Sequence, residues 1–171
     1  MNLTFDRVGK TLNHEDIAML EKELGIVLPL QYQQFLMQHN GGHPSLPVFS
    51  YMNTYLGFNE WSSSVVSDFF RVTDKTDIYD IRRRQLIAEG RIPSPLLPIA
   101  SDAFGNTICI GTEGEWLGKV YLYHHEYEFE PEPGEPETSF ENVFPIADDF
   151  NTFIQSLRAM DIEEDDKSNA L

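Results

Sequence analysis

The sequence predicts an α+β fold: a single domain in which an antiparallel meander of about four to six strands packs against helices from both ends of the chain. Three observations predict it. Apolar residues recur at helical spacing near both ends, short apolar runs rich in β-branched residues fill the middle, and 171 residues suffice for a core without metals or disulfides. We assign the domain to residues 1–160 and expect the acidic stretch 161–171 to be a disordered tail.

The first helix is expected over residues 13–24. Asn13 can cap its start, and Asp16 stands three residues later, as in a capping box. Gly25 follows the last apolar position of the run, where a left-handed residue commonly closes a helix. Helix and turn are therefore both encoded locally.

A second helix is expected over residues 29–40. Pro29 suits the first helical position because it lacks a backbone N–H and has a preset φ. Four residues then follow at helical spacing: Tyr32, Phe35, Leu36 and His39. Asn40, Gly41 and Gly42 tolerate positive φ, so they allow a tight reversal into an extended segment.

The middle of the chain is read as strands joined by short turns. We expect strands near 47–52, 97–101, 106–111 and 117–125, a short strand near 141–145, and helices near 76–89 and 148–159. A turn within 111–118 predicts a hairpin, and Gly105 lies in a second turn that extends it to a three-stranded meander.

The segment 51–70 is rich in aromatic residues but shows no steady period. Its members are Tyr51, Tyr55, Phe58, Trp61, Phe69 and Phe70. Because aromatic side chains favour burial, we expect most of them in the core. Trp61 stands beside three serines and is instead a candidate exposed anchor for a partner.

The net charge of −16 is concentrated in two segments. Residues 126–141 hold seven acids and no bases, and residues 161–171 hold five acids and one base, so together they carry −11. Phosphate contacts need a basic footprint, so this distribution argues against a nucleic-acid binder. An acidic surface favours a basic partner, and residues 126–141 can be either such a surface or a solvated loop. The tail 161–171 is interpreted as a solvated stretch.

Candidate chemical sites are sparse. His39 and His43 have metal-ligand spacing, but Asn40, Gly41 and Gly42 break the helix between them. Strand alternation would place His124 and Glu126 on one face and His125 on the other. One histidine and one carboxylate are too few to hold a metal, so a structural hydrogen bond between them is the favoured interpretation.

Neither a nucleophile nor an anion site is predicted. Cys109 lies between two isoleucines in an expected central strand, which indicates a buried, inert thiol. The basic cluster Arg82 to Arg84 is read as a solvated helix face with Asp80 as its ion-pair partner, three and four residues before Arg83 and Arg84. The start of the chain does not have the order of a signal peptide, and no apolar run is long enough to span a membrane, so a cytoplasmic protein is expected.

Four pieces in order resemble the SUKH superfamily, which includes a yeast cell-wall-synthesis regulator and many bacterial immunity proteins. The first piece is residues 24–42, where Leu-Gly-x-x-Leu-Pro follows a helix and Asn-Gly-Gly ends the next one. The second is the run 97–106, the third is the pair of strands 108–110 and 118–126, and the fourth is the closing helix pattern 146–157. The likeness covers roughly residues 10–160.

The resemblance implies a non-catalytic binding protein without a cofactor. It would be an immunity protein that binds and neutralises a basic toxin domain, for example a nuclease. Its candidate contacts are Trp61 and an acidic band formed by Glu126, Glu128, Glu130, Glu132, Glu135 and Glu137. Gly25, Pro29, Tyr32, Asn40, Gly41, Gly42 and Gly105 are the structural motif. A monomer or weak homodimer is expected.

Two alternatives stay open from the sequence. One is a hydrolase or small-molecule-binding domain with a cleft near His124, Glu126 and Trp61, which requires a deep pocket where these groups converge. The other is a regulatory scaffold, as the yeast relative allows.

Overall fold

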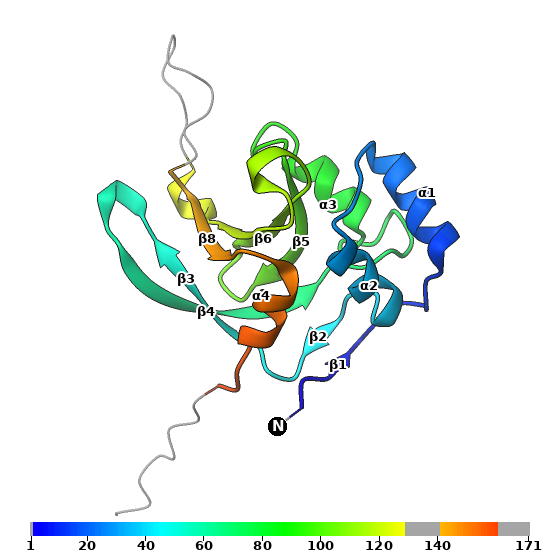
Figure 1. Ribbon diagram of the computed structural model, residues 1–171, viewed down its shortest axis with the longest axis horizontal. Coiled ribbons are helices and arrows are strands. Elements are labelled where there is room, and N and C mark those ends of the chain that lie inside the picture. The colour runs from blue at the N-terminus through cyan, green and yellow to red at the C-terminus, as the bar shows by residue number, and fades with distance from the viewer. Residues whose placement is uncertain (1, 129–140, 161–171) are drawn as a thin grey trace, which may run out of the picture.

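The computed structural model describes residues 2–128 and 141–160, which build a strongly curved antiparallel sheet with helices on both faces (Figure 1). The helices are α1 (His14–Leu24), α2 (Leu30–Gln38), α3 (Ile81–Ala88) and α4 (Phe150–Ser156). The main sheet contains β3 (Val48–Asn53), β4 (Glu60–Phe69), β5 (Leu96–Asp102), β6 (Thr107–Gly111), β7 (Val120–Tyr123) and β8 (Val143–Ala147). A separate pair joins β1 (Phe5–Asp6) to β2 (His43–Pro44).

The six strands of the main sheet lie in chain order, so the whole sheet is a meander. Every pairing between neighbours is antiparallel. The curvature brings the two ends of the sheet together, since the ring of Tyr51 on β3 stacks 5.8 Å from that of Phe144 on β8. The predicted α+β fold is confirmed.

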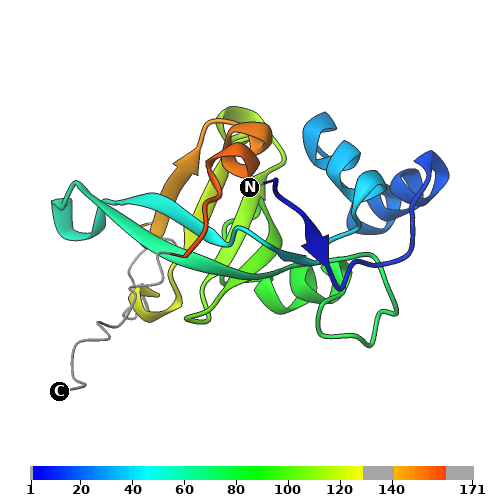
Figure 2. The same cartoon turned by 90° about the horizontal axis from the view of Figure 1, so that it is seen from below.

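Alternate residues along the central strands enter two different clusters. Ile108, Ile110 and Leu122 belong to the main core, which α1, α2 and α4 also enter. Cys109 and Tyr123 point to a smaller cluster on the opposite face. Figure 2 shows α4 on one side of the sheet and α3 on the other, consistent with this division.

The first helix has the ends that the sequence predicted. Asn13 accepts hydrogen bonds from the backbone of Glu15 and Asp16, and Asp16 accepts one from the backbone of Asn13, which completes a capping box. Gly25 closes the helix with φ 69°. Pro29 caps α2 instead of occupying its first helical position, a shift of one residue.

The reversal after α2 is held by side-chain and steric constraints. Asn40 has φ 48°, and its buried amide donates to the carbonyl oxygens of Lys10 and Val72 and accepts from the Val72 N–H. A Cβ on Gly41 would lie 2.6 Å from the Phe70 carbonyl oxygen, so this close approach requires glycine. Tyr32 is fully buried in the same core.

The longest strand, β4, was not predicted, and neither was the short pair of β1 and β2. The segment that forms β4 contains Ser62, Ser63, Ser64 and Ser67, which broke up the apolar pattern. In the structure Ser63 lies opposite Ser50 of β3, and burial alternates from Ser64 onward. Strand preference depends on such cross-strand context more than on the residue itself.

Several predicted elements are shorter than expected. The helix predicted from residue 76 begins at Ile81, because buried Asp80 caps it by accepting from the Arg82 and Arg83 N–H groups. The strand predicted to reach residue 125 ends at Tyr123, and His125–Tyr127 form a 3-10 turn, η3. In the described residues no helix is long and apolar enough to cross a membrane.

Candidate protein-binding site

The β3–β4 hairpin extends away from the body of the molecule in both views (Figures 1 and 2). Its tip holds three large apolar side chains in solvent: Leu56, Phe58 and Trp61 are 72%, 57% and 69% exposed. We call these three residues the hairpin tip. Exposed clusters of this kind commonly mark interaction surfaces, and tryptophan is enriched among binding hot spots.

The backbone of the hairpin tip is ordered by hydrogen bonds. The Tyr55 N–H donates to Asn53 Oδ1 at 3.0 Å, and the Phe58 N–H donates to the Tyr55 carbonyl oxygen at 3.0 Å. Leu56 adopts a left-handed φ of 51° in the 3-10 turn η1 (Tyr55–Gly57). A left-handed conformation costs a bulky residue roughly 1–2 kcal/mol relative to the right-handed one. Leu56 therefore destabilises the turn while its side chain lies in solvent.

An aromatic stack ties the turn of the hairpin to η3. The Tyr55 and Tyr127 rings lie 4.1 Å apart and nearly parallel. The His124 ring also stacks on Tyr127, at 4.2 Å. The two candidate regions predicted from the sequence, around Trp61 and from Glu126 onward, are therefore tied together in space. Their connection runs through Tyr55 and Tyr127.

A buried polar network fixes η3 from beneath. Asp102 accepts hydrogen bonds from the Ser64 hydroxyl at 2.7 Å and from the Asn106 side-chain amide at 2.8 Å. Asn106 Oδ1 in turn accepts from the His125 backbone N–H and from His125 Nδ1, at 3.1 and 2.9 Å. The chain of contacts links β4, the β5–β6 turn and η3. Gly105 has φ 88° in that turn, with space for a Cβ limited by the His125 ring at 3.4 Å.

The acidic residues of this region differ in their engagement. Glu126 in η3 and Glu60 at the start of β4 are both exposed, and neither forms an ion pair with a described residue. Glu128 binds Arg91 through two hydrogen bonds of 2.9 and 2.6 Å, which lower the pKa of its carboxyl. Glu130, Glu132, Glu135 and Glu137 lie outside the described residues, as does the tail 161–171.

The predicted alternation of His124, His125 and Glu126 is wrong, because the strand ends before them. His125 binds Asn106, His124 packs against Tyr127, and no hydrogen bond between described residues joins Glu126 to either histidine. Burial lowers the pKa of His124. Trp61 lies on the exposed hairpin, and none of the four cavities lined by described residues includes His124, Glu126 or Trp61.

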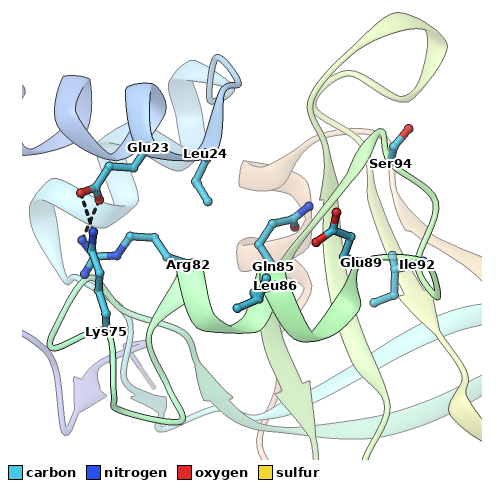
Figure 3. Close-up of a pocket in the computed structure, with 10 residues that line it drawn as sticks. Glu23, Leu24, Lys75, Arg82, Gln85, Leu86, Glu89, Ile92 and Ser94 are labelled. Carbon is cyan, nitrogen blue, oxygen red and sulfur yellow. Dashed lines mark hydrogen bonds and ion pairs between the residues drawn. The ribbon is translucent and has the colours of Figure 1, made fainter.

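A cavity of about 470 Å³ lies elsewhere, between α1 and α3 (Figure 3). Three of its four charged lining residues pair with one another: the Glu23 carboxylate binds Lys75 at 2.7 Å and Arg82 at 2.8 Å, and Glu89 is the fourth. Hydrogen bonds from Arg82 and then from Lys75 lower the pKa of Glu23. His124, Glu126 and Trp61 are not among the residues that line it.

The basic cluster on α3 is not a solvated face as predicted. Arg82, rather than Arg83 or Arg84, pairs with Asp80, at 2.7 Å, and Arg84 packs 4.6 Å above the ring of Phe70. Burial alone would raise the pKa of Asp80, but hydrogen bonds from Arg82 and the Thr73 N–H outweigh it and lower the pKa. Among the three arginines only Arg83 is exposed.

The remaining candidates have structural surroundings. Cys109 is buried, and burial raises the pKa of its thiol. Within the described residues no group of three or more histidine, cysteine, aspartate or glutamate side chains is placed to hold a metal.

Sequence reasoning missed Leu56 and Phe58 as exposed residues. Their aromatic and aliphatic chemistry predicted burial, and only the Gly57 turn signal and the following serines hinted at a hairpin end. The hairpin was missed because it requires β4 to pair with β3, and β4 was not predicted from the sequence.

The order of these elements can be compared with known families. The family model described as SMI1 / KNR4 family (SUKH-1) matches residues 11–156. The chain belongs to this family. The chain is also similar to the SPbeta prophage-derived uncharacterized protein YokK of Bacillus subtilis (strain 168), at 25% identity over 169 residues, which cover 92% of this chain and 81% of YokK. The resemblance inferred from residues 24–42 and the later runs is confirmed.

Proposed function

We propose that this chain is a non-catalytic immunity protein that binds a cognate toxin domain and blocks its action in the cytoplasm. One observation carries the proposal: an ordered hairpin holds Leu56, Phe58 and Trp61 in solvent. Glu60 in the same hairpin and Glu126 in η3, which the Tyr55–Tyr127 stack ties to the hairpin turn, form no ion pair with any described residue. Apolar anchors supply affinity in protein interfaces, and flanking charges select the partner and speed encounter. Membership in the SUKH-1 family and a prophage-derived relative support this setting.

The chemistry of the surface indicates the partner. A net charge of −16 and acids flanking an apolar tip favour a basic domain with an apolar recess. Domains that act on nucleic acid carry such basic grooves, because they bind phosphates. A basic nuclease toxin is therefore the partner that we propose.

The test starts from the gene immediately upstream, and uses the C-terminal toxin domain that we expect it to encode. Co-expression is expected to restore growth, and the two proteins are expected to co-purify as a stoichiometric complex. The double variant Phe58→Ser/Trp61→Ser is expected to lose both, while Val8→Ser/Met19→Ser, which alters exposed apolar residues away from the hairpin, is the matched control. Full neutralisation by the hairpin variant would exclude the hairpin tip as the interface.

Two further measurements separate the components of the proposal. Titration of the toxin tests the non-catalytic mechanism, because inactivation well below one chain per toxin would indicate catalysis instead. Charge reversal at Glu126, Glu128, Glu130, Glu132, Glu135 and Glu137 tests the acidic band. Unchanged affinity and unchanged salt dependence would remove the band from the interface.

A further inference from the structure

We propose that a second surface binds a basic segment of a protein partner, one that carries apolar side chains. The surface is a groove between the α1–α2 loop, the β6–β7 turn and the start of α4. Two cavities form it, of about 480 and 590 Å³, and they share Val27 and Thr112 as lining residues. We call it the loop groove.

The loop groove exposes apolar side chains from two of its walls. Val27 and Leu30, which flank the start of α2, are 72% and 66% exposed, and Leu117 across from them is 55% exposed. Each lies in a short, structured segment. A continuous apolar lining of this kind can bury the apolar side chains of a partner.

The α1–α2 wall is held in place from within. Leu28 is buried in the core, its N–H donates to Glu21 Oε1 at 2.8 Å, and its carbonyl oxygen accepts from the Gln33 side chain at 2.8 Å. Because Leu28 points inward, its neighbour Val27 is presented outward. The wall is therefore formed before any partner arrives.

The β6–β7 wall is equally constrained. A Cβ on Gly111 would lie 1.8 Å from the Trp116 carbonyl oxygen, so the turn folds back on the strand more closely than any other residue allows. The Gly118 N–H donates to the Gly111 carbonyl oxygen at 2.9 Å, and the Thr112 hydroxyl donates to the Pro95 carbonyl oxygen at 3.0 Å. Preformed walls reduce the ordering entropy that binding must overcome.

The third wall is tied to α2. The Asn151 N–H of α4 donates to Gln31 Oε1 at 2.9 Å, and Gln31 and Asp149 both line the groove. Asp149 caps α4 by accepting from the Thr152 N–H and hydroxyl, and these hydrogen bonds lower its pKa. The carboxylate therefore stays charged where it borders the groove.

Charge selects the occupant. The charged lining residues of the two cavities are Glu21, Lys22, Glu113, Asp148 and Asp149, four acids and one base. Neither Glu113 nor Asp148 forms an ion pair with a described residue. A basic, apolar segment complements both features, whereas a second copy of this acidic chain would bring like charges together.

The first test uses three synthetic peptides and the full chain labelled for NMR. One peptide alternates lysine and leucine, one replaces leucine by serine at equal charge, and one replaces lysine by glutamate. Only the lysine–leucine peptide is expected to shift the resonances of Val27, Leu30 and Leu117 in a saturable way. Equal shifts from the lysine–serine peptide would indicate charge alone and overturn the proposal, and so would shifts confined to other surfaces.

Variants then assign the two contributions. Val27→Ser/Leu30→Ser is expected to weaken binding of the lysine–leucine peptide at least about tenfold, and Glu113→Lys/Asp148→Lys is expected to do the same and to reduce the salt dependence. The hairpin variant Phe58→Ser/Trp61→Ser is the control and is expected to bind the peptide unchanged. The proposal thus stands or falls separately from toxin neutralisation.

Sedimentation of the full chain without peptide addresses the competing occupant. A monomer is expected across the concentration range. A dimer that Val27→Ser/Leu30→Ser converts to monomer would show that a second copy fills the loop groove, and would overturn the proposal.

Discussion

Where α1 meets α3, charged side chains satisfy one another within the chain, whereas the hairpin tip leaves large apolar side chains without cover. Asp80 is fully buried and bound by Arg82, which also reaches Glu23. Trp61, by contrast, is 69% exposed on an ordered strand. If the hairpin tip is the proposed binding surface, substitutions near Asp80 should reduce stability without affecting binding, and substitutions in the hairpin tip should weaken binding without affecting stability.

The largest effect is expected at Asp80, where α1 meets α3. Asp80→Ala removes the cap of α3 and leaves Arg82 without its closest carboxylate, so the free energy of unfolding should fall by about 3–5 kcal/mol. Urea denaturation measures this. Asp6→Ala, which removes an exposed carboxylate beside Arg7, is the matched control and should change stability by less than about 1 kcal/mol.

The next effect is expected at the hairpin tip and in binding alone. Trp61→Ala should weaken the toxin complex by about 2 kcal/mol or more, a loss of roughly thirtyfold, because exposed aromatic anchors dominate protein interfaces. Its unfolding free energy should change by less than about 0.5 kcal/mol. Calorimetric titration measures the affinity and urea denaturation measures the unfolding free energy, both on one preparation. A large loss of stability would show that Trp61 supports the fold, as Asp80 does, and would contradict the prediction.

Leu56→Gly sharpens the contrast, because it should move stability and affinity in opposite directions. Glycine adopts the φ of 51° without a Cβ clash, so the folded state should gain up to about 1 kcal/mol, partly offset by glycine's greater unfolded-state entropy. The loss of the leucine side chain should weaken toxin binding. Leu56→Ala, which removes contact area but keeps the clash, separates the two contributions.

The smallest effect concerns pH and two half-buried histidines. Burial lowers the pKa of His39 and of His124. The unfolded chain takes up protons at a pKa of about 6.5 and the folded chain only at lower pH, so stability should fall as pH drops below about 6.5. The carboxylates with lowered pKa lose their contribution only below about pH 4, a separate window.

Unfolding free energies measured by urea between about pH 7 and 5 test this dependence. His39→Gln and His124→Gln should flatten the slope in that range, whereas His14→Gln, at an exposed position, is the control. An unaltered slope in both of these variants would show that other groups govern the loss of stability at low pH.

The sequence predicted what local geometry decides and missed what distant contacts decide. The Asn13 cap and the Gly25 closure involve neighbours within four residues, and both are present. Strand β4 depends on pairing with β3 and β5, and its serines obscured the pattern. The exposed tip was least predictable, because the preference of Phe58 and Leu56 for burial is overridden where the hairpin leaves the sheet.

The charged residues show the same division. The sequence placed Asp80 with Arg83 and Arg84 by helical spacing, but as a cap Asp80 lies before the helix and binds Arg82 instead. Trp61 was selected as a candidate contact from its serine neighbours, and its exposure agrees with that role. The loop groove left no pattern in the sequence, since its walls come from three separated segments.

The stacked pair of Tyr55 and Tyr127 has a consequence for how such proteins diversify. The two rings, 4.1 Å apart, hold the start of the hairpin turn against η3, and none of residues 56–61 that follow belongs to either hydrophobic cluster. That stretch can be replaced as a cassette while the scaffold beneath keeps its shape. Under the proposed function, substitutions at these six positions alone would change the partner of the protein, and grafting them onto a related scaffold would transfer that specificity.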